Sequence, residues 1–298
     1  MQVNKEKVVA NFGIDFYKKA CYDLEKYVKT WGLSDFEAID NYTWSCTFKC
    51  ISDKYGLCVL KIFEDPKSCE LQCCVLNEYN GRGFCKLYES DINNGVCLLE
   101  RILPGTPLGD EPDFDKRINM LCEFWRCLHI EPADKNNYDS YMTWVNNMTE
   151  YMSMREDCKE LYIQMAKAQE ICRQLYEKYP IEVCLHNDLD PESDNLLYDD
   201  SHGCYRAIDP REPVVGPALF DFVFGIGYGN IKTNLHITGI MSKKLNIPEY
   251  DLWCAIYVSI CLEICRQVKY GGESNIDLIL QTEMLMNEMQ SSAYTIHH

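Results

Sequence analysis

Basic residues are scarce in this sequence. Its 298 residues include 29 lysines and arginines against 46 acidic residues, which gives a formal net charge of -17. A surface this acidic repels nucleic-acid backbones and anionic membranes, so we expect neither as a partner. It attracts cationic small molecules or metal ions, although acidity that only keeps the protein soluble is the alternative explanation.

Several features of membrane, secreted and zinc-binding proteins are missing. No apolar run reaches the ~18 residues of a membrane span. The first residues, MQVNKEKVVANFGIDF, lack the apolar core of a signal peptide. No two cysteines have the CxxC spacing, so a zinc ribbon is unsupported. These absences predict a cytoplasmic protein.

Cysteine, in contrast, is abundant, with 18 in the chain. A chain of this length does not need disulfides for stability. Many of the cysteines stand where a small hydrophobic residue would fit, such as Cys261 and Cys265 in YVSICLEICRQV. Because free cysteine packs as a small hydrophobe, we expect reduced thiols rather than a disulfide framework.

The pattern of apolar residues predicts two lobes of an α+β protein. Residues 1–102 are expected to form a β-rich lobe, 103–112 a linker, and 113–298 a helical lobe. The first lobe is expected to contain helices at 14–35 and 68–83, the second capped by Ser68, a hairpin of strands 42–52 and 56–63, and strands 84–90 and 95–102. The second lobe is expected to contain helices at 114–130, 140–179 with an internal break, 249–270 and 276–291.

One stretch of the second half is densely acidic: VCLHNDLDPESDNLLYDDSHGCYRAIDPRE, from Val183 to Glu212. It contains six aspartates, although like charges close together cost energy. The stretch is therefore either a solvated acidic loop or a site that holds a cation. Within it, Asp199 and Asp200 are expected to form a solvated turn.

Three features occur in an order that suits phosphoryl transfer: a lysine late in an apolar strand (Lys61 in CVLKIF), then LHNDLDPESDN, then AIDPRE. A lysine holds nucleotide phosphates, and an aspartate accepts the proton of the attacking hydroxyl. An asparagine and a second aspartate hold Mg²⁺, which offsets the clustered negative charge. Taken alone, Lys61 is better explained as a charged residue that protects an edge strand from pairing.

The same segments resemble a known family. HNDLDP…NLL resembles the HGDLHPGN-type catalytic loop of aminoglycoside phosphotransferases, and AIDPREPVVGPALFD resembles a segment of one branch, the streptomycin 6-kinase and hydroxyurea phosphotransferase family. VLKI, NEYNGRGFCKLYE, CLLERILPGTPL and LCEFWRCLH resemble further segments of that branch, in the same order. The resemblance implies a protein-kinase-like bilobal fold with a small antiparallel β-sheet N-lobe and a larger helical C-lobe. It also implies ATP, Mg²⁺ and a small hydroxyl-bearing acceptor.

The resemblance assigns roles to individual residues. Asp188 matches the catalytic base, and His186 matches the histidine that orients the catalytic loop. Asn195 and Asp209 match the metal ligands, and Lys61 matches the phosphate-binding lysine.

Two further assignments concern the first lobe. Glu70 is the preferred helix partner of Lys61, with Glu78 as the competitor. Glu100, Arg101 and Ile102 match the hinge, whose backbone would face the adenine.

The catalytic loop departs from the family pattern. In the family, the metal-binding asparagine follows the catalytic base by five residues. Here Asn195 follows Asp188 by seven. Asp190 would restore the spacing, but Asp188 is preferred because His186 then also matches. Asn187 replaces the usual glycine, at a position where a left-handed backbone is needed and asparagine tolerates it.

The turn expected to cover the nucleotide, DNYTWSCT, contains no glycine, so its amides would reach phosphates less freely. Together with the lengthened loop, this supports one alternative, a nucleotide-binding or interaction protein that has lost catalysis. Retention of the lysine, the asparagine and both aspartates supports an active enzyme.

The expected function is therefore an ATP-dependent O-phosphotransferase for a small hydroxylated molecule. The acidic surface suits a cationic acceptor such as an aminoglycoside of the streptomycin type, which would make the protein an antibiotic-resistance enzyme. A kinase for a metabolic small molecule is the other alternative, because similarity of fold does not determine a substrate.

Overall fold

A computed structural model describes residues 3–39, 45–224, 226 and 230–296, with side chains described as far as residue 290. The chain separates into two compact units. The sheet unit comprises Met1–Thr106 and Leu197–Ile208, and the helical unit comprises Pro107–Leu196 and Asp209–His298. The predicted α+β class, with an antiparallel sheet and a larger helical part, is confirmed.

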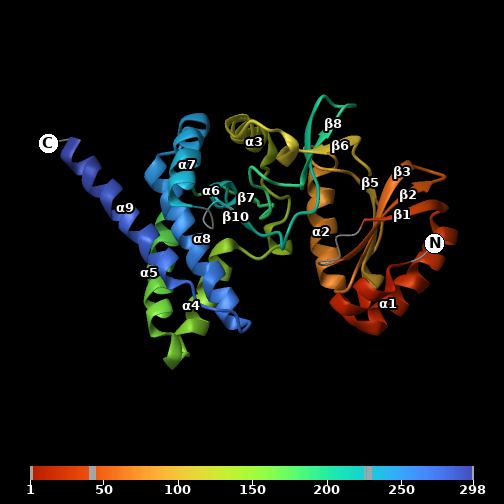
Figure 1. Cartoon of the computed structure of the whole chain (residues 1–298), viewed down its shortest axis with the longest axis horizontal. Helices are drawn as coiled ribbons and strands as arrows, with labels where there is room; N and C mark the ends of the chain where they lie inside the picture. The colour runs from red at the N-terminus through yellow and green to blue at the C-terminus, as the bar shows by residue number, and fades with distance from the viewer. Residues whose placement is uncertain (1–2, 40–44, 225, 227–229, 297–298) are drawn as a thin grey trace. The chain divides into compact units, whose positions relative to one another are not determined.

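The sheet unit contains a five-stranded antiparallel sheet with the order β1-β2-β3-β5-β4 (Figure 1). In the predicted hairpin of β2 and β3, Ser52 pairs with Gly56 and Ser45 with Phe63. Because β3 lies between β2 and β5, the interpretation of Lys61 as an edge-strand residue is wrong. The strands are β1 (Leu33–Ile39), β2 (Ser45–Ser52), β3 (Gly56–Phe63), β4 (Leu87–Asp91) and β5 (Val96–Glu100).

Helix α1 (Lys5–Thr30) covers one face of this sheet (Figure 1). It bends at Gly13, whose φ of 85° lies in the region that favours glycine. Apolar side chains beyond the bend recur at intervals of about four residues, so they share one helix face. They join a core with the apolar side chains of β2, β3 and β5; they include Phe16, Ala20 and Leu24.

The sequence predicted the first helix at 14–35, and both boundaries are wrong. The helix begins earlier because the side chain of Asn4 caps its first turn. It ends at Thr30 because Gly32 follows with a φ of 59°, which turns the chain into β1.

Helix α2 (Pro66–Tyr79) covers the opposite face of the sheet (Figure 1). Its N-cap is Asp65, whose carboxylate accepts the backbone N–H groups of Lys67 and Ser68 at 3.0 and 3.2 Å. The predicted cap, Ser68, is therefore wrong, because Asp65 followed by Pro66 starts the helix earlier. Asn80 ends the helix in the left-handed conformation, with a φ of 45°.

A second sheet has the order β6-β8-β9, formed by β6 (Pro104–Pro107), β8 (Leu196–Asp199) and β9 (Cys204–Ala207). Ala207 on β9 donates its N–H to Gly83 at 2.7 Å and accepts the N–H of Cys85 at 3.0 Å. These bonds join the β8–β9 hairpin to the sheet unit, which therefore consists of two chain segments.

A buried arginine holds this hairpin. Arg206 on β9 is 2% exposed, and its guanidinium contacts Asp199 at 2.7 Å and Glu100 at 2.6 Å. It also donates to the carbonyl of Phe84 at 2.5 Å. Both carboxylates are thus paired with a cation inside the unit.

The prediction that Asp199 lies in a solvated turn is wrong, whereas Asp200 is exposed. Burial by itself raises the pKa of Asp199, but hydrogen bonds from Ser201 and Arg206 hold that pKa well below its usual range. Asp199 is buried because its partner arginine stands on the adjacent strand.

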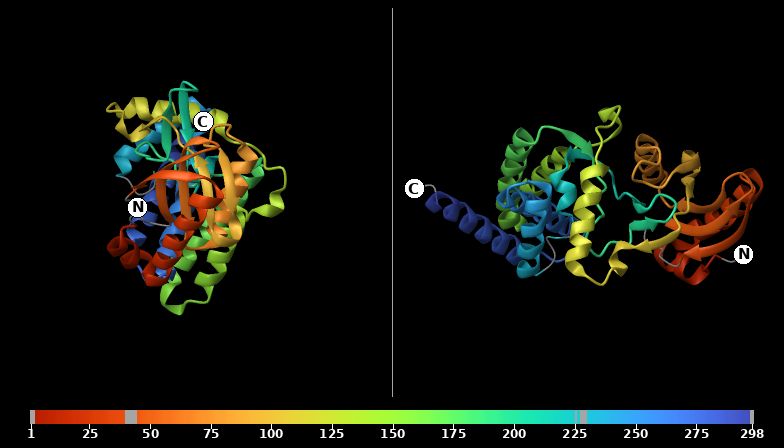
Figure 2. Two further views of the ribbon diagram at one scale, coloured as in Figure 1. Left: turned by 90° about the vertical axis from the view of Figure 1, so that its right-hand side faces the viewer. Right: turned by 90° about the horizontal axis from the view of Figure 1, so that it is seen from above.

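The helical unit is arranged around α8 (Glu249–Lys269), which packs against α4, α5, α7 and α9 (Figure 2). Most of α8 is apolar, which is typical of a buried helix. The other helices are α3 (Phe114–Leu128), α4 (Tyr141–Ser153), α5 (Lys159–Lys178), α6 (Leu219–Phe222), α7 (Ile231–Leu245) and α9 (Ile276–Ile296). Short 3₁₀ turns occupy Ile92–Asn94, Leu108–Asp110, Lys135–Asn137 and Glu156–Cys158.

Strands β7 (Glu182–Cys184) and β10 (Val215–Pro217) pair antiparallel within the helical unit. The predicted break inside 140–179 is confirmed, since α4 ends at Ser153 and α5 begins at Lys159. Among the described residues, no helix combines the length and the apolar character that crossing a membrane requires.

Replacing Arg206 with Met is expected to lower the free energy of unfolding by about 3–5 kcal/mol. The change leaves the buried carboxylate of Asp199 and the partly buried one of Glu100 without their cation. Urea denaturation measures this change. The control is Arg155→Met, which removes an ion pair with Asp157 on the surface, where such pairs add little. Equal losses in the two variants would contradict the assignment.

Candidate active site

The predicted catalytic loop follows β7 in the helical unit. Its backbone turns sharply at Asn187, which has a φ of 59°. The prediction that asparagine occupies a left-handed position here is confirmed. The Asn187 side chain also donates to the carbonyl of Glu212 at 3.2 Å, which ties the loop to the segment that follows β9.

The loop is held by Asp221, a fully buried carboxylate in α6. One oxygen accepts the backbone N–H groups of His186 and Asn187 at 3.0 and 2.8 Å. The other lies 2.8 Å from Nε2 of His129, at the end of α3. Asp221 thus positions the loop through hydrogen bonds.

The charge of Asp221 is preserved despite its burial. Burial raises the pKa of a carboxyl group, but the contacts from His129, the charge of His186 and the N–H of Asn187 together lower the pKa of Asp221. These contacts therefore favour the ionised form of the buried carboxylate.

The lengthened loop still brings Asn195 to Asp188. The Asn195 side-chain amide donates to the Asp188 carboxylate at 2.9 Å and to its backbone carbonyl at 3.2 Å. The two residues are seven positions apart in sequence but in direct contact in the structure.

The residues between them form a turn that takes up the extra length. The N–H of Ser193 donates to the carbonyl of Asp190 at 3.1 Å, and the Ser193 hydroxyl accepts the N–H of Asn195 at 3.0 Å. The Asp190 carboxylate accepts the N–H of Glu192 at 2.7 Å. Asp190 therefore stabilises the turn, whereas Asp188 faces the asparagine.

Burial raises the pKa of Asp188, and the neighbouring charge of Asp209 raises it further, while His186, Arg211 and Asn195 lower it. Asp209 is exposed and has a φ of 57°. The charge of Asp209 thus acts on Asp188, and Asn195 contacts Asp188 directly. Carboxylate and amide oxygens are the ligands that Mg²⁺ prefers. The residues present therefore fit the metal ion that the resemblance implies.

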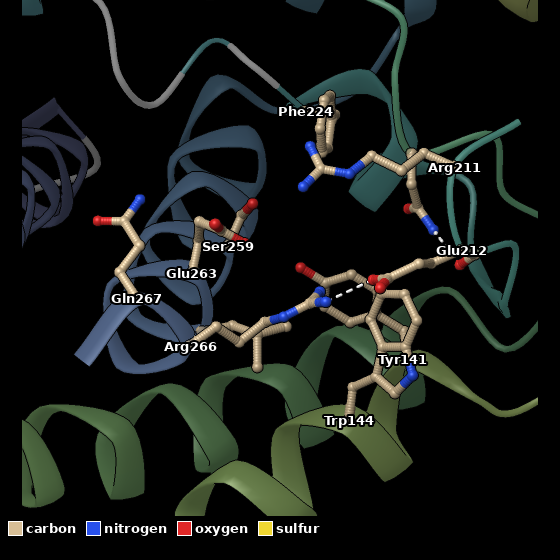
Figure 3. Close-up of a pocket in the computed structure, with 11 residues that line it drawn as sticks. Tyr141, Trp144, Arg211, Glu212, Phe224, Ser259, Glu263, Arg266 and Gln267 are labelled. Atoms are coloured by element: carbon tan, nitrogen blue, oxygen red, sulfur yellow. Dashed lines mark hydrogen bonds and ion pairs between the residues drawn. The ribbon is translucent and has the colours of Figure 1, made fainter. Parts of the chain in front are cut away.

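A cavity of about 290 Å³ opens beside this loop, within the helical unit (Figure 3). Asn187 of the predicted catalytic loop is one of the residues that line the cavity. Aromatic residues of α4, Tyr141 and Trp144, form one wall, and Ser259 and Glu263 line it from α8. A volume of this size suits a small organic molecule.

The cavity contains charges of both signs. Glu212 and Arg266 form an ion pair, and the Arg266 guanidinium lies 5.2 Å from the Trp144 ring. The Arg211 guanidinium lies 5.9 Å from the ring of Phe224, which Figure 3 shows beside it. The charged residues of the lining are thus two acids and two arginines, and Glu263 also acts electrostatically on Arg266.

The predicted nucleotide-binding residues lie in the sheet unit. Lys61 is 5% exposed on the central strand β3, and its ammonium lies 5.1 Å from the Phe63 ring. Glu70 forms an ion pair with Lys67 at 2.8 Å. The pairing of Lys61 with Glu70 or Glu78 stays a prediction.

The predicted hinge, Glu100 to Ile102, begins at the last residue of β5. The Glu100 carboxylate is bound by Arg206 and by the N–H of Lys86, so its side chain is structural. Ile102 is buried, and Arg101 is partly exposed. The glycine-free turn DNYTWSCT begins in residues 40–44, which lie outside the described part of the chain.

Sequence reasoning missed three features of the structure. The role of His129 was hidden because its partner, Asp221, is 92 residues away. The Arg206 cluster was missed because Asp199 stands in a sequence typical of an exposed turn. The cavity residues Trp144 and Glu263 belong to helices without a motif, and only packing brings them together.

The sequence matches no protein-family model and no curated protein. The structure is similar to aminoglycoside phosphotransferase APH(4)-Ia, with 14% identity, 90% of this chain and 97% of that chain covered, and a TM-score of 0.59. It is also similar to an ethanolamine kinase of Plasmodium vivax, with 14% identity, 93% of this chain and 88% of that chain covered, and a TM-score of 0.60. A third similar structure is choline kinase LicA from Streptococcus pneumoniae, with 13% identity, 92% of this chain and 99% of that chain covered, and a TM-score of 0.56.

One similar structure is a ternary complex of an APH(4)-Ia mutant with AMP-PNP and hygromycin B. At these identities the likeness concerns the fold, and the chain has the protein-kinase-like bilobal fold of these small-molecule kinases. The closer resemblance to the streptomycin 6-kinase branch stays a prediction.

Replacing Asp221 with Asn is expected to lower the free energy of unfolding by about 1.5–3 kcal/mol near neutral pH, because hydrogen bonds to a charged group are lost. The folded-state pKa of Asp221 is lowered. Its contribution is therefore complete above the pKa of an unfolded aspartate, about 4, and is lost as the pH falls below it. Denaturation at several pH values measures the difference.

The exposed Asp200→Asn variant is the control, since it is expected to follow the wild type at every pH. A difference between wild type and Asp221→Asn that stays constant into acid would contradict this account of the buried carboxylate.

Proposed function

We propose that the protein is an ATP-dependent O-phosphotransferase for a small hydroxylated molecule. The contact of 2.9 Å between Asn195 and Asp188 supports this most directly, because it joins the predicted base to the predicted metal ligand despite the longer loop. The cavity beside Asn187 offers room for an acceptor next to that base. AMP-PNP in a protein of the same fold supports the choice of donor.

In this proposal Asp188 accepts the proton of the acceptor hydroxyl and orients it for attack on the γ-phosphate. Burial raises the pKa of Asp188, which makes its carboxylate a better proton acceptor. Asn195 fixes the carboxylate by its hydrogen bond. Asp221 holds the loop backbone and so acts on position rather than on chemistry.

Asn195 and Asp209 would hold Mg²⁺, which neutralises phosphate charge when bound. Lys61, on a rigid central strand, would hold the nucleotide phosphates. Glu70 or Glu78 would orient Lys61, and the backbone of Glu100, Arg101 and Ile102 would contact the adenine.

The acceptor is proposed to be cationic, as aminoglycosides are. The acidic protein surface would attract such a molecule. Inside the cavity, Glu263 offers a carboxylate and Tyr141 an aromatic face, both of which attract cations. A metabolic cation with a hydroxyl group fits this surface as well as an antibiotic does.

Asp188→Asn is expected to lower the rate of phosphate transfer by a factor of about 10²–10⁴, because it removes the general base. Nucleotide affinity should stay near that of the wild type. Asp190→Asn should retain transfer, since an amide oxygen still accepts the turn's N–H. The measurement is transfer from γ-labelled ATP with Mg²⁺ across streptomycin, other aminoglycosides, hydroxyurea, choline and ethanolamine.

Loss of transfer in Asp190→Asn but not in Asp188→Asn would reverse the assignment of the base. An absence of nucleotide binding by the wild type would refute the proposed function. Binding without transfer to any acceptor would favour the alternative of a nucleotide-binding protein that has lost catalysis.

Glu263→Gln is expected to raise KM for a cationic acceptor by a factor of about 10–100 and leave kcat nearly unchanged. The reason is that the lost contact stabilises the bound acceptor and the transition state equally. Steady-state kinetics with the acceptor found above measures both constants. Glu273→Gln, at an exposed position outside the cavity, is the control and should match the wild type. An unchanged KM in Glu263→Gln would contradict the proposed cation contact.

A further inference from the structure

Three buried cysteines meet between α2 and β5 in the sheet unit. Cys69 and Cys73 stand one turn apart on α2, and Cys97 lies on β5. The sulfur atoms of Cys69 and Cys73 are 3.9 Å apart, and all three sulfur atoms lie within 4.8 Å of one another. Each residue is at most 1% exposed. The structure therefore presents three donor atoms that already converge.

This convergence distinguishes the three from the other thiols. Buried cysteine is usually explained as a small apolar residue. Cys261 and Cys265 illustrate that case, because they are also buried and one turn apart, on α8. In the part of the chain that the structure describes, only Cys69, Cys73 and Cys97 bring three cysteine, histidine or acidic donors together.

The spacing matches the geometry of a metal–thiolate centre. A metal–sulfur bond of about 2.3 Å places sulfur ligands about 3.8–4.0 Å apart in tetrahedral or trigonal geometry. The measured distance between Cys69 and Cys73 falls in this range. Cys97 would complete the triangle through a small side-chain adjustment, since all the sulfur atoms lie within 4.8 Å of one another.

A positive charge lies close to the cluster. Lys61 lies opposite Cys97 in the β3–β5 ladder, and its positive charge acts on Cys69. A metal cation at the centre of the cluster would stabilise the thiolates in the same way.

We propose that Cys69, Cys73 and Cys97 bind one soft metal ion as a three-thiolate site, and that the ion is Cu⁺. Soft thiolate ligands select Cu⁺ and Zn²⁺ among the biological metals. Structural Zn²⁺ sites almost always have four ligands, whereas this cluster supplies three from the described residues. The site does not depend on the proposed phosphotransferase activity, and its test needs no acceptor.

The test is a titration of the reduced full-length chain with Cu⁺ against a chromophoric Cu⁺ chelator. Cys127 and Cys204 are replaced by Ser throughout, because these exposed thiols would bind copper on the surface. One Cu⁺ per chain is expected to be retained, with thiolate-to-copper absorption in the ultraviolet and three sulfur neighbours by X-ray absorption spectroscopy. The midpoint of thermal unfolding should also rise when the ion binds.

Serine variants locate the site. Cys69→Ser, Cys73→Ser and Cys97→Ser are each expected to weaken Cu⁺ binding at least tenfold. The control is the double variant Cys261→Ser, Cys265→Ser, which should bind Cu⁺ as tightly as the starting chain. Equal binding by all these chains, or no retained copper in the starting chain, would overturn the proposal. Retention of Zn²⁺ in preference to Cu⁺ would overturn the assignment of a three-coordinate copper site. If a serine variant fails to fold, X-ray absorption of the unsubstituted cluster still tests the proposal. Three sulfur neighbours around the copper would support it, and any other number would overturn it.

Discussion

The arrangement of the candidate active site depends on one buried carboxylate, that of Asp221. It is the common acceptor for two consecutive loop amides and the partner of His129. A buried charge is stable only when it is fully hydrogen-bonded, so these contacts are required together. Because the amides belong to His186 and Asn187, the position of Asp188 follows from them. The geometry of the proposed catalytic loop therefore rests on a group that needs no contact with substrate.

The extra residues of the catalytic loop show how a change in spacing can leave a site intact. Ser193 and Asp190 close a turn by hydrogen bonds, and the chain returns so that Asn195 touches Asp188. The number of residues between Asp188 and Asn195 therefore overstates the difference from the family loop that this one resembles. What the proposed chemistry requires is the contact, and positioning of reacting groups supplies much of catalysis.

The interior of the sheet unit contains charged side chains as well as apolar ones. On one side, Arg206 neutralises Asp199 and Glu100 and attaches the β8–β9 hairpin. On the face covered by α2, Lys61 shares its surroundings with three converging thiols. The lysine proposed to hold phosphates thus lies beside the cluster proposed to bind a metal ion, in a unit where buried charge is repeatedly offset by a neighbour.

The sequence by itself determined the fold class, the central hairpin and the break between α4 and α5, because these follow from local periodicity and turn residues. It also predicted the left-handed Asn187, since a single backbone position decides it. Only the tertiary structure decided that Asp199 is buried, that Asp221 meets His129 and that three cysteines converge. These contacts join side chains from different elements of the fold, such as Asp221 and His129, which are 92 residues apart. No local pattern specifies which side chains folding brings into contact.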